Sequence, residues 1–75
     1  MTLDLRTRIA YLIHFSDSIS EGYFYGDSSY VTEKNGKIMP LWDKIVKDFY
    51  RISDGYFQVA DMILEEVRSD ERNKV

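Results

Sequence analysis

The single histidine, His14, is the residue of this chain best suited to acid–base or metal chemistry. Asp17 follows about one helical turn later, where its carboxylate could orient the imidazole for proton transfer or contribute to a metal site. A transition metal takes three or four ligands, and the 75 residues contain no cysteine and no second histidine. We therefore interpret His14 as a surface or rim histidine, and we predict no metal site.

Acidic residues gather in the last third of the chain, where Asp61 and Glu65 fall one turn apart and Glu66 follows. Paired carboxylates can bind a divalent cation or share a proton. No second carboxylate-bearing helix or Glu-x-x-His element completes such a site, and Arg68 is close enough along a helix to neutralise Glu65. These carboxylates are predicted to form a solvated helix face.

Nucleophilic catalysis and phosphate binding lack their sequence signatures. The serines near His14 lie on the same short stretch, and no Gly-x-Ser-x-Gly elbow occurs. The four glycines fit neither a Walker loop nor a dinucleotide-binding fingerprint. We predict a protein that is not an enzyme, with no catalytic residues and no cofactor.

Aromatic residues are the unusual part of the composition, at 15% of the chain, with six tyrosines among them. Large aromatic side chains dominate small cores, and on this ground Trp42, Phe49 and Phe57 are expected to be buried. The central segment has too few apolar neighbours to bury its aromatic residues, so we predict that they contact a partner. The predicted partner-binding residues are Tyr23, Phe24, Tyr25 and Tyr30.

The element that carries His14 is a helix predicted over residues 3–19, because its apolar residues recur at spacings of three, four and seven. Thr2 or Asp4 can cap its first turn, and Gly22 suits a left-handed residue just past its end. Tyr11 and Phe15 widen the apolar arc, which implies two contacting surfaces.

The central segment is predicted to contain a β-hairpin over residues 30–39. Two short β-prone runs flank Asn35-Gly36, a dipeptide suited to the positive φ angles of a type I′ turn. The stretch 22–26 before it could be a third short strand or a loop folded onto the helices.

Beyond the hairpin, Pro40 suits the first turn of a helix. An apolar stripe then follows at helical spacing, formed by Leu41, Ile45, Phe49 and Ile52 and continued by Tyr56, Val59, Ile63 and Val67. Ser53-Asp54-Gly55 predicts a break, followed by a third helix from about Asp54 to Ser69. The stripe keeps its helical phase across this break, so one helix over 41–67, about 40 Å long, is the alternative, and it would need a dimer. The predicted fold class is mainly α (α+β), with an N-terminal helix, a short central hairpin or loop, and two helices or one long kinked helix.

Length and charge narrow the class of protein. We predict one small domain over 1–69 and a disordered tail over 70–75, with oligomerisation as the remaining means of adding stability in a chain without disulfides. A net charge of −3 with interleaved signs provides no concentrated positive field for nucleic acid. The absence of a signal peptide and of a long apolar run predicts a cytoplasmic protein with no membrane span.

The leading functional hypothesis is a small non-catalytic regulator or inhibitor, of the kind that phages and mobile elements carry. It would mask a surface on a larger protein of unknown identity. The first alternative is a structural protein that self-assembles, as a homodimer, through the helical stripe. The second is a nucleic-acid-associated protein resembling a helix-turn-helix, whose recognition helix would offer only Gln58 for reading bases.

Overall fold

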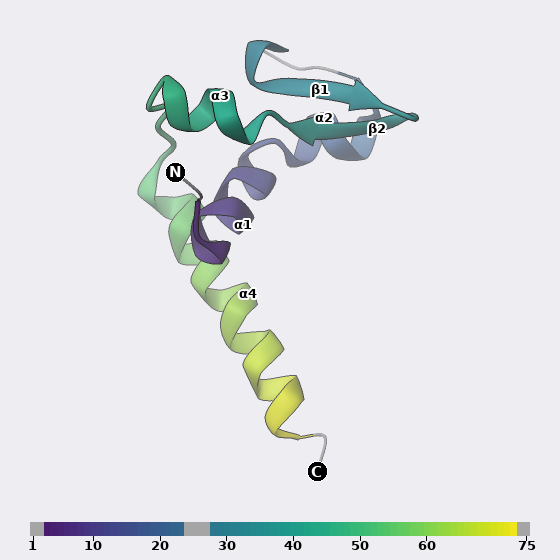
Figure 1. Ribbon diagram of the computed structural model, residues 1–75. Coiled ribbons are helices and arrows are strands. Elements are labelled where there is room, and N and C mark those ends of the chain that lie inside the picture. The colour runs from purple at the N-terminus through teal and green to yellow at the C-terminus, as the bar shows by residue number, and fades with distance from the viewer. Residues whose placement is uncertain (1–2, 24–27, 74–75) are drawn as a thin grey trace.

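A computed structural model describes residues 3–23 and 28–73 of the chain, and it confirms a mainly helical α+β fold (Figure 1). A single two-stranded antiparallel sheet is present in the described part of the chain. The elements in order are α1 (Leu5–His14), α2 (Ser16–Glu21), a 3₁₀ turn (Ser28–Tyr30), β1 (Val31–Lys34), β2 (Lys37–Pro40), α3 (Trp42–Lys47) and α4 (Asp54–Arg72).

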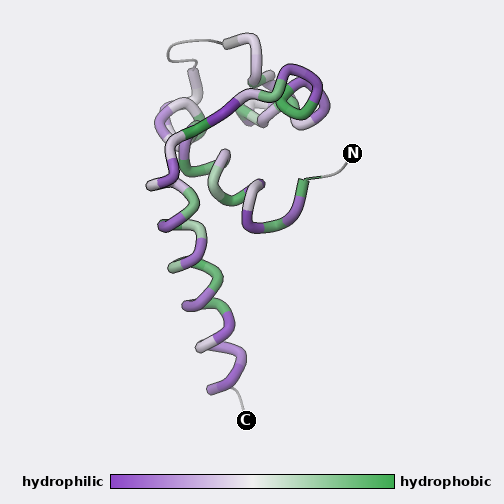
Figure 2. Tube along the Cα trace, turned by 90° about the vertical axis from the view of Figure 1, so that its left-hand side faces the viewer, coloured by the Kyte–Doolittle hydropathy of each residue, from purple (hydrophilic) through white to green (hydrophobic). Residues whose placement is uncertain are grey.

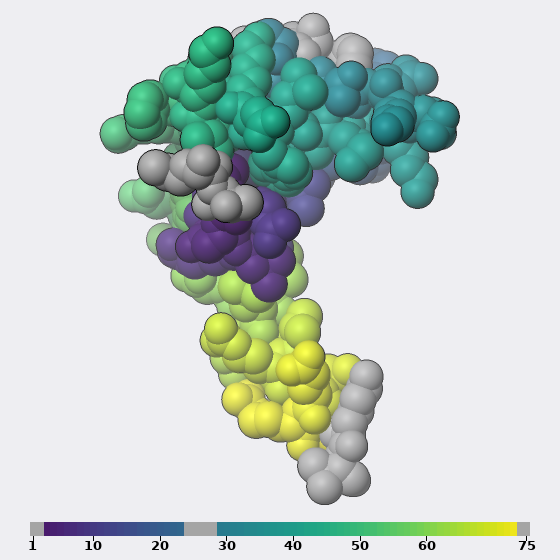
Figure 3. Space-filling view, viewed as in Figure 1, coloured from purple at the N-terminus to yellow at the C-terminus, as the bar shows by residue number. Residues whose placement is uncertain are grey.

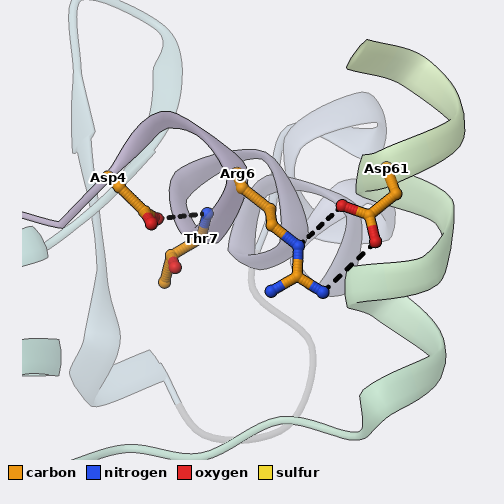
Figure 4. A network of polar contacts seen from close by, with 4 residues as sticks. All are labelled: Asp4, Arg6, Thr7 and Asp61. Carbon is orange, nitrogen blue, oxygen red and sulfur yellow. Dashed lines mark hydrogen bonds and ion pairs between the residues drawn. The ribbon is translucent and has the colours of Figure 1, made fainter. Parts of the chain in front are cut away.

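The N-terminal helical region starts and ends as its sequence indicates but is divided at Phe15. The Asp4 carboxylate accepts a hydrogen bond from the Thr7 backbone N–H at 2.9 Å, which caps α1 (Figure 4). Gly22 ends α2 with φ +78°. The single helix predicted over 3–19 is wrong at Phe15, whose φ and ψ of −93° and 10° separate α1 from α2 while its side chain is buried in the core. The bend lets α2 contact β2.

The predicted hairpin is confirmed, including its turn. Asn35 and Gly36 both have positive φ, at 54° and 77°, as a type I′ turn requires. The register pairs Val31 with Pro40 and Lys34 with Lys37. Pro40 therefore ends β2 and does not begin a helix, which corrects the sequence-based placement. Its missing N–H costs little, because no strand other than β1 pairs with β2 among the described residues.

The prediction of two helices after the hairpin is confirmed, although the connection between them is longer than predicted. Helix α3 ends at Lys47, and residues 48–53 lead to α4. Phe49, expected in the core as part of the stripe, is instead 81% exposed, because the helix ends before the stripe does. At its other end, α4 continues to Arg72, three residues past the predicted end at Ser69.

The core lies between α1, the hairpin and α3. Ile45 is its most completely buried large side chain, at 1% exposure. Its other buried members are Tyr11, Phe15, Val31 and Ile38, with Leu3, Tyr30, Trp42, Tyr50 and Ile52 partly buried around them.

Helix α4 is attached to the rest of the fold mainly through α1. The Arg6 guanidinium bonds both carboxylate oxygens of Asp61, at 2.6 and 3.2 Å (Figure 4). The carbon of the guanidinium lies 5.0 Å from the centre of the Phe57 ring. Ala10 in α1 and Ala60 in α4 are fully buried, and such small side chains allow close helix packing. The C-terminal half of α4 projects past α1 into solvent (Figures 1 and 3), giving a molecule of 42 × 26 × 22 Å.

Candidate protein-binding surface

The central aromatic residues predicted to bind a partner have different environments. Tyr23, just after α2, is 55% exposed. Phe24 and Tyr25 lie outside the described residues. Tyr30 is half-buried against the core: its ring centre is 4.3 Å from that of Tyr50, and its hydroxyl donates to the Asp48 carboxylate at 3.0 Å. Tyr30 thus contributes strongly to the packing of the fold.

His14 lies at the rim of the core, inside a cluster of aromatic rings. Its Nε2 is 2.8 Å from the Tyr50 hydroxyl, and its ring packs edge-on against Phe15 and Tyr56. Its Nδ1 is buried without a hydrogen-bond partner. We assign the proton of the neutral ring to Nε2, because a proton on Nδ1 would be a buried, unpaired donor. Burial lowers the pKa of His14 below its usual value.

This environment predicts a pH-dependent stability. In the unfolded chain His14 has a pKa of about 6.5 and takes up a proton more readily than in the fold. The contribution of the neutral His14 ring to the free energy of unfolding is therefore fully present above about pH 6.5. It is lost as the pH falls through 6.5 towards the lower pKa of His14 in the folded protein. We expect the free energy of unfolding, measured with urea at pH 7.5, 6.5 and 5.5, to decrease across this series. His14→Gln, which cannot gain this charge, should flatten the decrease, and an equal decrease in both proteins would contradict the assignment.

Two of the carboxylates of α4 are engaged in ion pairs. Asp61 pairs with Arg6, and Glu65 accepts a hydrogen bond from Arg72 at 2.9 Å, not from Arg68 as its spacing suggested. Within residues 3–23 and 28–73, no three histidine, aspartate or glutamate side chains lie close enough together to hold a metal ion. Over the same residues, no helix combines the length and apolar character that crossing a membrane requires.

The end of α3 presents an aromatic side chain in an unusual backbone conformation. The N–H of Phe49 bonds the carbonyl of Val46 at 3.2 Å, and the N–H of Tyr50 bonds that of Ile45 at 3.1 Å. These two bonds form a Schellman motif, with Phe49 at the left-handed position that glycine usually occupies. Its φ is +53°. A bulky side chain is rare in this region of backbone space.

An apolar pocket of about 200 Å³ opens beside Phe49. Tyr11 and Ile45 contribute to it from the buried core, and more exposed walls come from Leu3, Val46 and Phe49. Arg51, which is exposed, adds a positive charge to its lining. The volume is below the range of about 300–1,000 Å³ of small-molecule sites and suits one large side chain of another protein.

A second exposed apolar surface runs along α4, where hydrophobic positions recur between hydrophilic ones and end before the hydrophilic last turn (Figure 2). We call it the α4 face, and its members are Val59, Met62, Ile63 and Val67, which are 42%, 67%, 39% and 51% exposed. A helix that packs on one neighbouring element buries one stripe of its side chains. The residues of the α4 face lie outside the stripe that α1 covers, so they are available for contact with a second molecule.

Sequence reasoning missed Phe49 as a surface residue and identified the α4 face only as part of a stripe. Phe49 continues the spacing of Leu41 and Ile45, so nothing in the local pattern separates it from a core residue. The helical stripe of Tyr56, Val59, Ile63 and Val67 could be recognised in the sequence, but the sequence does not show which side of this helix α1 covers.

Comparison of the chain with protein-family models, with curated proteins and with solved structures found no match.

Proposed function

We propose that this protein is a non-catalytic interaction protein that binds an apolar surface of another protein through Phe49 and the pocket beside it. The exposure and backbone conformation of Phe49 carry the proposal. A left-handed conformation costs a non-glycine residue about 1–2 kcal/mol, and an 81% exposed ring recovers little of this by burial. The fold itself would be served better by glycine, so the aromatic side chain is best explained by a contact outside the chain.

The chemistry of the pocket defines the kind of partner. Its lining is apolar apart from the positive charge of Arg51. A partner that inserts one aliphatic or aromatic side chain, with an acidic residue next to it, would satisfy both features. Binding of this kind would mask a surface on the partner, and we propose a regulator or inhibitor that acts in the cytoplasm.

Phe49→Gly should separate binding from stability. Glycine removes the strain at the left-handed position but adds freedom to the unfolded chain, and the balance should stabilise the protein by roughly 0.5–1 kcal/mol. Loss of a central aromatic anchor should weaken binding by roughly 30-fold or more. Urea unfolding measures the first quantity, and calorimetric titration with the purified partner measures the second.

The partner can be obtained by affinity capture with the wild-type protein from extracts of the source cells, followed by mass spectrometry. Tyr23→Ala is the matched control, because it removes an exposed aromatic side chain from the site predicted on sequence alone. We expect a protein that the wild type and Tyr23→Ala retain and Phe49→Gly loses. Loss with Tyr23→Ala and retention with Phe49→Gly would overturn the site in favour of the central segment.

The α4 face favours a second candidate function, which is self-association. We propose that the protein is a homodimer, since four partly exposed apolar residues lie along a helix that projects from a small domain. No comparable observation favours nucleic-acid binding. Residues 48–53 connect α3 and α4, whereas the turn of a helix-turn-helix has about three or four residues.

A further inference from the structure

Helix α4 is apolar around too much of its circumference for one neighbour. At 100° per residue, its apolar positions from Met62 round to Phe57 span about 220°, whereas a helix with one neighbour needs a stripe of about 100°. Contacts with α1 occupy the side of Phe57 and Asp61, and Ala60 is fully buried. The α4 face lies on another side of the helix. A second body of comparable length is needed to cover it.

The arrangement of the α4 face is symmetric about Ile63. This residue is the midpoint of α4 (Asp54–Arg72), and Val59 and Val67 lie four residues before and after it. A twofold axis at Ile63 would place Ile63 against its copy and Val59 against Val67 of the second chain. Such a self-complementary surface is what a twofold dimer requires.

The acidic residues on the same side of α4 select the direction of pairing. Glu66 and Asp70 lie at the helical angles of the α4 face, so a parallel pair would bring each against its own copy. In an antiparallel pair centred on Ile63 neither residue meets its own copy, because the two copies of Glu66 would be about 9 Å apart along the helices and those of Asp70 about 21 Å. Opposed helix dipoles further favour this direction.

We propose that α4 pairs with α4 of a second copy of this chain, antiparallel and centred on Ile63. The projecting C-terminal half of each helix then lies beside the N-terminal half of the other. This inference rests on the proposed self-association and specifies its surface and direction. It is independent of the proposed binding through Phe49, so a result that contradicts one of the two proposals does not contradict the other.

Ile63→Glu should convert the dimer to a monomer, because it places two carboxylates together at the twofold axis. We expect dimerisation weakened roughly 100-fold or more, measured by sedimentation equilibrium over a concentration series. Since Ile63 is 39% exposed in the single chain, the helical circular dichroism should be retained. The control is Arg68→Glu, which changes the net charge more but lies about 140° round the helix from Ile63.

The sedimentation outcomes separate self-association from the surface that mediates it. A wild-type protein that stays monomeric up to several hundred micromolar would overturn the self-association itself. A dimer that Ile63→Glu leaves intact, or that Arg68→Glu disrupts equally, would overturn the α4 face while leaving the dimer.

Disulfide cross-linking tests the direction, and the native chain has no cysteine to interfere. Ile63→Cys should cross-link to its own copy under mild oxidation. Val67→Cys should not, because the two copies of residue 67 would be about 12 Å apart along the antiparallel helices, beyond disulfide reach. A mixture of Val59→Cys and Val67→Cys proteins should form the mixed dimer. Efficient self-cross-linking of Val67→Cys would indicate a parallel pair and overturn the proposal.

Discussion

Replacing Tyr50 by alanine is expected to remove about 3–5 kcal/mol from the free energy of unfolding. The Tyr50 ring contacts Tyr11, His14, Phe15 and Tyr30, with ring centres 4.3 to 6.1 Å away. The Tyr50 hydroxyl also lies 2.8 Å from Nε2 of His14. For a 75-residue domain the whole free energy of unfolding is about 4–11 kcal/mol, so a large part of the Tyr50→Ala protein, or all of it, should be unfolded.

Urea unfolding followed by far-ultraviolet circular dichroism measures this effect. Tyr50→Phe is the matched control, since it keeps the ring and removes only the hydroxyl that faces His14 Nε2. Its expected cost is about 1–2 kcal/mol, the value of one partly buried hydrogen bond. If the alanine and phenylalanine variants unfold at the same urea concentration, the ring is not the main source of stability at this position.

Replacing Ile45 by alanine is the second change with a large expected effect, at about 2–5 kcal/mol. Ile45 is 1% exposed and belongs to the core cluster. It also lines the pocket beside Phe49, and its carbonyl accepts the Tyr50 N–H that closes the end of α3. Shortening the side chain removes apolar contacts from the core and deepens the pocket at the same time.

The same unfolding measurement applies, with Ile45→Val as the control at about 0.5–1.5 kcal/mol. The larger loss should appear only for alanine, because valine removes one methylene group and alanine removes three carbon atoms. Equal losses for the two variants would show that the space around Ile45 relaxes freely, which would also weaken the case for a pocket of fixed shape beside Phe49.

Structural features that depend on only a few neighbouring residues could be predicted well from the sequence. The positive φ angles at Asn35-Gly36, the Asp4 cap and the left-handed Gly22 follow from the chemistry of one to four neighbouring residues. The start of α4 at Asp54 was likewise marked by local turn and capping residues. These features depend little on the rest of the fold, and the sequence determined them by itself.

The division at Phe15 and the strand position of Pro40 depended on contacts between distant segments. Phe15 is buried and lies at the bend between α1 and α2, which directs α2 towards β2. Pro40 is compatible with both a helix start and a strand end, and pairing with Val31 selected the strand. Local propensity cannot distinguish such alternatives, because tertiary packing decides between them.

The candidate surfaces were decided by where helices stop and what covers them. Periodicity assigned Phe49 to an apolar stripe, but α3 ended at Lys47 and left its ring in solvent. Tyr30, predicted to face a partner, became part of the core through Tyr50 and Asp48. The sequence determined that α4 is broadly apolar, while only the packing of α1 against one side of it left Ile63 and its neighbours uncovered. Periodicity specifies the apolar side of a helix, but exposure depends on segments that are distant in the chain.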